Sequence, residues 1–145
     1  MGASQIKTLQ GSGVTMLAPR GGVNVGQLTA ASQGKSSSDL GVVTTGGGPI
    51  SMVVRDDVEV NRSRVFTVGR GDLLIWASEG DIDAGRGAKT VTGAPPPVYR
   101  LVNGQIVVDT SGSYAGSGIA VLDADSTLDL YAPRGTIDAG DAGIK

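Results

Sequence analysis

Carboxylates are the residues of this sequence whose type and spacing could do chemistry. Asp56 and Asp57 directly follow Arg55, and two carboxylates can cleave a glycosidic bond when held about 5 to 9.5 Å apart with one pKa raised. The chain has no histidine and no cysteine, which excludes imidazole and thiolate catalysis and the usual zinc ligands. The acidic pair falls at a turn, where polar residues are expected. We therefore predict no catalytic residues and keep a polysaccharide-active enzyme as the alternative.

Calcium binding is a second chemistry open to carboxylates. Acidic pairs occur at Asp81 and Asp83 and at Asp138 and Asp141, and Ca²⁺ takes about six to eight oxygen ligands. The glycine-rich phrase G-G-x-G-x-D of calcium-binding β-rolls is absent. We interpret these pairs as solvated corners and predict no metal site and no cofactor.

The tripeptide Arg70-Gly71-Asp72 is one that some adhesins present to integrin receptors. It lies just before a predicted strand, where a corner could display it. Three-residue matches are common by chance. Aligned corners of the chain carry other residues at the Asp72 position, namely Gly13, Pro49 and Thr127. A tight turn is the structural interpretation, and receptor binding is the alternative.

The elements that position these residues come from one repeated unit, found near residues 11–26, 47–61, 70–85 and 125–140. In each unit apolar residues alternate with others, which indicates a strand. The first apolar positions align as Val14, Ile50, Leu73 and Leu128, and the next as Met16, Met52, Ile75 and Leu130. After a short turn, a second apolar pair begins at Val23, Val58, Ile82 and Ile137. Each unit therefore reads as strand, turn, strand.

A two-strand unit with one apolar face cannot bury that face alone, so like units must stack around a shared core. The sequence predicts an all-β protein, a parallel β-helix forming one domain over residues 1–145. Its corners need positive φ, a role that we assign to glycines, namely the turn residues Gly21, Gly80 and Gly135 and the terminal residues Gly26, Gly85 and Gly140.

Unequal spacing predicts two longer insertions between the stacked coils, because the aligned strands start 36, 23 and 55 residues apart. We place the insertions at residues 27–45 and 86–124. Within the second, residues 99–109 predict a small hairpin centred on Asn103-Gly104. The run from Val65 to Val68 is expected to be the third strand of a coil.

The blocks from Gly71 to Thr90, from Leu130 to Gly135 and from Ile137 to Gly140 resemble the filamentous haemagglutinin family of bacterial surface proteins, and the similarity extends over nearly the whole chain. The resemblance implies a right-handed β-helical stalk, exported by two-partner secretion across an outer membrane and involved in adhesion or cell contact. The implied partner is a protein or glycan on a host cell or a neighbouring cell. A purely mechanical spacer is a further alternative.

Charge and hydropathy limit the remaining partners. The formal net charge is -2 without runs of like charge, so no nucleic-acid partner is predicted. No apolar run approaches the ~20 residues that cross a bilayer, so membrane insertion is not predicted. The sequence starts without a signal peptide, and we expect the export signal of a secreted, surface-associated protein to lie outside this fragment. Open ends of the β-helix predict self-association, with folded-over insertions as the competing outcome.

Strand alternation also predicts an apolar ladder on the outside of the first strands of the units, formed by Leu17, Val53, Trp76 and Tyr131. Stripes of this kind usually mark a contact surface, so something should cover it.

Two kinds of cover are possible for this ladder. The chain itself could cover it, with residues 86–124 laid along the stripe and contributing Tyr99 or Tyr114. Alternatively, Trp76 and Tyr131 could offer flat faces to a sugar ring or to another chain. We expect self-coverage, because burying an aromatic side chain stabilises a long loop.

Overall fold

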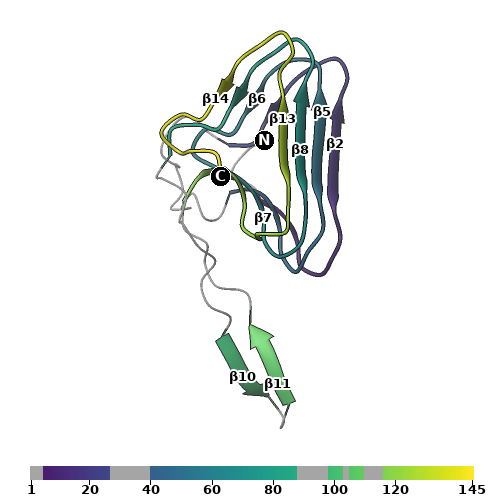
Figure 1. Cartoon of the computed structure of the whole chain (residues 1–145), viewed down its shortest axis with the longest axis vertical. Helices are drawn as coiled ribbons and strands as arrows, with labels where there is room; N and C mark the ends of the chain where they lie inside the picture. The colour runs from purple at the N-terminus through teal and green to yellow at the C-terminus, as the bar shows by residue number, and fades with distance from the viewer. Residues whose placement is uncertain (1–4, 27–39, 88–97, 103–104, 110–115) are drawn as a thin grey trace.

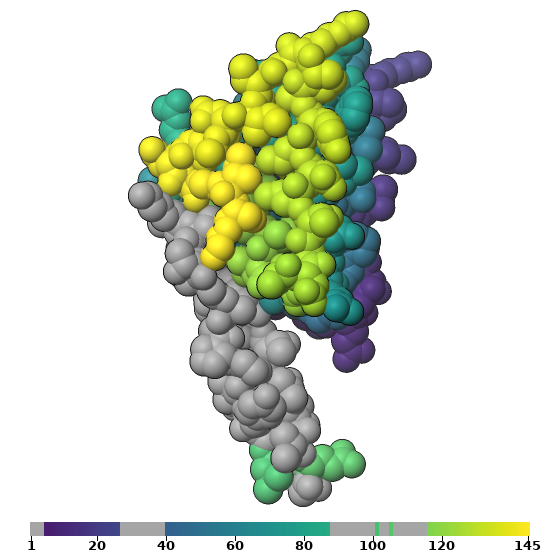
Figure 2. Space-filling view, viewed as in Figure 1, coloured from purple at the N-terminus to yellow at the C-terminus, as the bar shows by residue number. Residues whose placement is uncertain are grey.

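The chain winds into a stack of four coils, each built of three short strands (Figure 1). The structure, a computed structural model, describes residues 5–26, 40–87, 98–102, 105–109 and 116–145. These residues form strands and turns without any helix, so no described helix could cross a membrane. Figure 2 shows coil 4 at the end of the stack nearest the viewer, with coil 1 behind it.

Each coil contributes one strand to each of three sheets. The strands of coil 1 are β1 (Gln5–Thr8), β2 (Val14–Ala18) and β3 (Val23–Asn24). Those of coil 2 are β4 (Gly41–Thr44), β5 (Ile50–Val54) and β6 (Val58–Glu59). Coil 3 has β7 (Arg64–Thr67), β8 (Leu73–Ala77) and β9 (Ile82–Asp83), and coil 4 has β12 (Gly118–Val121), β13 (Leu128–Tyr131) and β14 (Ile137–Asp138).

All strand pairs between coils are parallel and in register. Sheet 1 has the order β1-β4-β7-β12, sheet 2 the order β2-β5-β8-β13, and sheet 3 the order β3-β6-β9-β14. The register pairs Ile50 with Leu73 and Leu73 with Leu128, as the aligned repeats predict. The parallel β-helix fold is thereby confirmed.

The core lies between the three sheets and is filled by the inward columns of the repeat. In the two central coils the side chains of Ile50, Met52, Leu73 and Ile75 are fully buried. The equivalent residues of the first and last coils, such as Met16 and Leu130, are only partly buried. The core is therefore fully shielded from solvent in the two central coils, whereas the two ends of the stack present apolar side chains to solvent.

Sheet 1 differs from the other two sheets because its central strands are buried on both faces. β4 and β7 have no exposed residue, and outward-facing Val43, Phe66 and Ala120 form a second apolar cluster. β7 confirms the third strand predicted at Val65. β4 and β12 lie within the ranges 27–45 and 86–124, so the ends of both predicted insertions are coil strands.

A hairpin of β10 (Val98–Val102) and β11 (Gln105–Asp109) lies between coils 3 and 4 in the sequence. Its strands are antiparallel, and Val102 pairs with Gln105, which confirms the predicted hairpin. Figure 1 shows it outside the stack of coils.

Glycine is required for different physical reasons in the two columns of corner residues. Gly85 and Gly140 have φ of 92° and 54°, as predicted, and Asn61 has φ of 57° at the aligned position of coil 2.

The turn residues Gly80 and Gly135 do not have positive φ, which corrects our expectation. They are required by close approach instead, since a Cβ on Gly135 would lie 2.1 Å from the carbonyl oxygen of Gly80. Positive φ is likewise absent at Gly21 and Gly26.

Candidate functional site

An apolar ladder runs along the outer face of sheet 2. Parallel pairing places Leu17, Val53, Trp76 and Tyr131 side by side on successive coils, as the sequence predicts. Their exposed fractions are 71%, 39%, 38% and 46%. The rings of Trp76 and Tyr131 stack with centroids 5.2 Å apart and planes tilted by 34°, and the Trp76 Nε1 donates to Ser78 Oγ at 3.1 Å.

The expectation that the chain covers its own ladder is wrong, because all four side chains keep a large exposed fraction. The buried outer face belongs to sheet 1 instead, where Phe66 is 1% exposed. The first coil strand after each inserted segment, β4 or β12, belongs to sheet 1 and not to sheet 2. Tyr114 and the side chain of Tyr99, which we expected over the ladder, lie outside the described residues.

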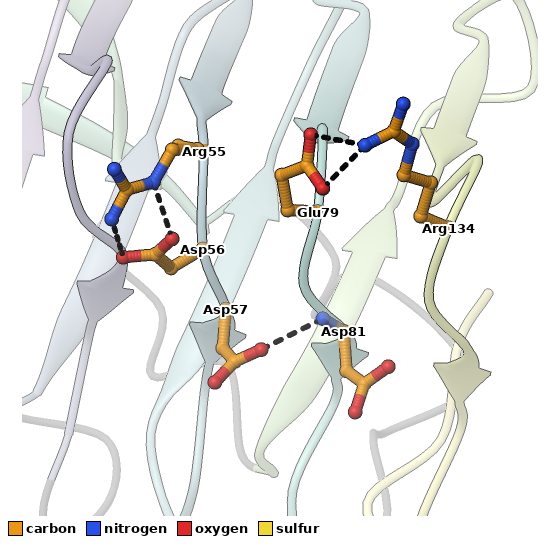
Figure 3. A network of polar contacts seen from close by, with 6 residues as sticks. All are labelled: Arg55, Asp56, Asp57, Glu79, Asp81 and Arg134. Atoms are coloured by element: carbon orange, nitrogen blue, oxygen red, sulfur yellow. Dashed lines mark hydrogen bonds and ion pairs between the residues drawn. The ribbon is translucent and has the colours of Figure 1, made fainter.

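Two ion pairs border the ladder at the turn after sheet 2 (Figure 3). Arg55 Nε lies 2.7 Å from Asp56 Oδ1, and Arg134 Nη1 lies 2.7 Å and 2.8 Å from the two carboxylate oxygens of Glu79. The hydrogen bond and charge of Asp56 raise the pKa of Arg55. The hydrogen bond from Arg55 lowers the pKa of Asp56.

The two carboxylates considered for glycoside cleavage, those of Asp56 and Asp57, bond to different partners. Asp56 turns toward Arg55, whereas Asp57 Oδ1 accepts a hydrogen bond from the backbone amide of Asp81 at 2.8 Å (Figure 3). A general acid needs a raised pKa, and that of Asp56 moves in the opposite direction. The arrangement is that of a structural corner.

Three of the four carboxylates considered for calcium binding accept hydrogen bonds from the chain itself. Asp81 Oδ1 accepts hydrogen bonds from the amide and hydroxyl of Thr136 at 2.7 and 3.0 Å, which lower the pKa of Asp81. Asp83 and Asp138 each accept a hydrogen bond from the backbone amide of the glycine two residues later. Among the described residues, no group of three acidic side chains is arranged to hold a metal ion.

The Arg70-Gly71-Asp72 corner is bonded to the matching corner of coil 4. Arg70 Nη2 lies 2.8 Å from Asp125 Oδ2, and the Gly71 amide donates to Ser126 Oγ at 2.9 Å. The Thr127 amide donates to Asp72 Oδ1 at 2.8 Å. The Arg70 side chain nevertheless remains 78% exposed.

Sequence reasoning did not anticipate these contacts between coils 3 and 4. The aligned repeats do contain a signal for these contacts. Asp72 and Asp81 of coil 3 each align with a threonine of coil 4, namely Thr127 and Thr136. A carboxylate at such a corner can accept a hydrogen bond from the backbone amide of the coil stacked on it. The corners of coil 3 therefore hold coil 4 in register despite the long segment inserted between them.

Comparison with known proteins identifies the chain at the level of its family. Searches of curated proteins and of solved structures gave no match. A family model described as filamentous haemagglutinin family outer membrane protein matches residues 70–145. The matched region is slightly more than half of the 145 residues and includes β8 and β9 of coil 3, the hairpin and all three strands of coil 4. The chain therefore belongs to the filamentous haemagglutinin family of outer membrane proteins.

Proposed function

We propose that this chain is a non-catalytic stalk segment of a secreted bacterial surface adhesin, through which the parent protein contacts a host cell or a neighbouring cell. The observation that carries the proposal is the in-register stacking of four coils around one core. A stack of this kind is stiff along its axis and extends by adding coils, which suits a protein that must reach away from a membrane. Two-partner secretion is the export route that the family resemblance suggests.

Two features support a binding role over catalysis. The polar side chains at the corners of coils 2 and 3 form ion pairs and hydrogen bonds within the chain, and Asp56 has a lowered pKa. The outer face of sheet 2 is apolar and exposed, which is typical of a contact surface. We infer that the partner, a cell-surface protein or glycan, is met by exposed faces and corners of the stalk.

Attachment of beads coated with the chain tests this proposal. Beads are counted on cultured host cells and on neighbouring bacteria, with beads coated with the heat-unfolded chain as control. We expect attachment by the folded chain only. Equal attachment of both kinds of bead, or none by either, contradicts an adhesive role and leaves a mechanical spacer.

The same assay tests the exposed Arg70 corner as a receptor site. Asp72→Glu keeps the charge but displaces the carboxylate, and Asp123→Glu makes the same change at another corner. If the tripeptide binds an integrin, attachment falls in the first variant alone. Circular dichroism must show that both variants keep the β-helix. Equal attachment by the two variants excludes this corner and assigns the contact to another part of the stalk.

A further inference from the structure

We propose that the outer face of sheet 2 is a lateral interface that binds a second copy of this chain, with the two β-helix axes side by side and pointing the same way. The proposal concerns contact between copies and is independent of what the stalk binds on another cell. It rests on the exposure of the ladder, on the charges at its two borders and on the geometry of the repeat.

Sheet 2 is distinct from the other sheet faces of the described coils. The outer face of sheet 1 is buried by the chain itself. The outward column of sheet 3 is polar throughout, consisting of Asn24, Glu59, Asp83 and Asp138. Among the outer sheet faces of the described coils, only that of sheet 2 presents contiguous apolar side chains to solvent.

A second copy fits this ladder because both surfaces have the same repeat. Successive coils are about 4.8 Å apart in a parallel sheet. A two-fold axis parallel to the β-helix axis places every ladder residue opposite the same residue of the other copy. Val53 then faces Val53, and Trp76 faces Trp76, without any mismatch in spacing.

The charges at the borders of the ladder select this orientation. The two-fold rotation reverses the strand direction, so the residues before the ladder in one copy face those after it in the other. Asp129 precedes Tyr131 on the outer face of β13, and its exposed side chain forms no hydrogen bond or ion pair with the described residues. It comes to lie opposite Arg134 of the other copy, whose side chain is 69% exposed. The pair forms twice, once on each side.

The opposite orientation, with the two axes antiparallel, brings like charges together. It sets coil 1 against coil 4 and coil 2 against coil 3, with equivalent turn positions facing each other. By the register of sheet 2, these positions are occupied by Arg20, Asp56, Glu79 and Arg134. Arg20 would then face Arg134, and Asp56 would face Glu79. Such contacts are unfavourable across an interface.

The aromatic pair is already ordered for this contact. Trp76 stacks on Tyr131 and is hydrogen-bonded to Ser78, so these rings have less rotamer freedom to lose on association. Trp and Tyr are also the residue types that contribute most at interfaces.

A cysteine cross-link tests the orientation directly, because the chain has no cysteine of its own. Val53→Cys is treated with a short bismaleimide, since packed sheets lie about 10 Å apart, which is farther than a disulfide spans. Glu59→Cys, on the outer face of sheet 3, is the matched control. We expect a covalent dimer from Val53→Cys alone, measured by intact mass. Equal cross-linking of the two variants, or none for Val53→Cys, overturns the proposal.

Sedimentation equilibrium tests the energetics with variants on the surface. Leu17→Ser and Tyr131→Ser should each raise the dissociation constant at least about tenfold. Asp129→Arg and Arg134→Glu should each weaken association, and the double variant should restore it because the charges are exchanged. Asp141→Arg makes the same charge change away from sheet 2 and should have no effect.

Three outcomes of sedimentation contradict the lateral interface. A chain that stays monomeric at all concentrations rules it out. Association that survives every ladder variant assigns the contact to the open ends of the stack. Loss of glycan binding in ladder variants of a monomeric chain identifies a sugar as the occupant instead. None of these outcomes depends on bead attachment, so the two proposals fail separately.

Discussion

The Oδ1 atom of Asp81 accepts hydrogen bonds from both the backbone amide and the hydroxyl of Thr136, although 55 residues separate them in the sequence. The two residues occupy the same corner of adjacent coils. A carboxylate holds the amide of the next coil here, where the strands of sheet 3 have not yet begun to pair. This contact makes the junction between coils 3 and 4 sensitive to the charge of Asp81.

We predict that acidification weakens this junction. The pKa of Asp81 is lowered from its ordinary value of 3.8 by its bonds to Thr136. A carboxylate with a lowered folded-state pKa contributes stability that is present above its unfolded pKa and is lost as the pH falls through the folded value. The melting temperature should therefore decrease as the pH is lowered below about 4. Asp81→Asn, which cannot titrate, should show a smaller fall, measured by circular dichroism.

Asp129→Asn is the control for this experiment, because the Asp129 side chain is exposed and forms no hydrogen bond or ion pair with the described residues. At low protein concentration, where copies do not associate, this variant should lose as much melting temperature on acidification as the parent chain does. If Asp81→Asn loses as much stability on acidification as the parent does, the charge of Asp81 does not hold the junction.

Substitution of a single corner glycine should destabilise the fold. Gly85 has φ of 92°, and a Cβ there would lie 1.8 Å from the carbonyl oxygen of Asn61. Gly85→Ala should therefore cost about 2 to 5 kcal/mol of unfolding free energy, from backbone strain and overpacking together. Gly21→Ala is the matched control, because a Cβ at Gly21 meets no atom within 4 Å. Urea titrations that give equal midpoints for both variants would contradict this account.

Much of the fold was predictable because the repeat fixes the register. Columns aligned in the sequence, such as Val53 with Trp76, are paired in the sheet, and strand alternation correctly predicts which of them face outward. Period-two alternation is the signal that carries both results.

Sheet 1 could not be predicted in the same way. β4 and β12 are four residues long and buried on both faces or nearly so, and a strand buried on both faces loses its apolar and polar alternation. Its residues therefore looked like parts of inserted loops. The same error led to the wrong cover for the ladder, because the second apolar cluster around Phe66 was not visible in the sequence.

Truncation of inward and outward residues of sheet 2 should have very different costs. Ile75 is fully buried between the sheets, whereas Leu17 points outward and is 71% exposed. Ile75→Ala should lower the free energy of unfolding by about 2 to 5 kcal/mol, because it leaves a cavity. Leu17→Ala should change it by less than about 0.5 kcal/mol. Comparable losses for the two variants would mean that the alternation of β2 and β8 is misassigned.

The stacked rings of Trp76 and Tyr131 should be coupled in stability as well as in space. Their centroids are 5.2 Å apart, and aromatic pairs at such distances contribute about 0.5 to 1.5 kcal/mol beyond the burial of their area. A double-mutant cycle with Trp76→Leu and Tyr131→Leu should give a coupling energy in this range. Unfolding is measured at low protein concentration, so that association of copies does not contribute. A second cycle with Leu17→Ala in place of Tyr131→Leu serves as control, because Val53 separates Leu17 from Trp76 along the ladder. Additive effects in both cycles would mean that the rings are neighbours without stabilising the stack.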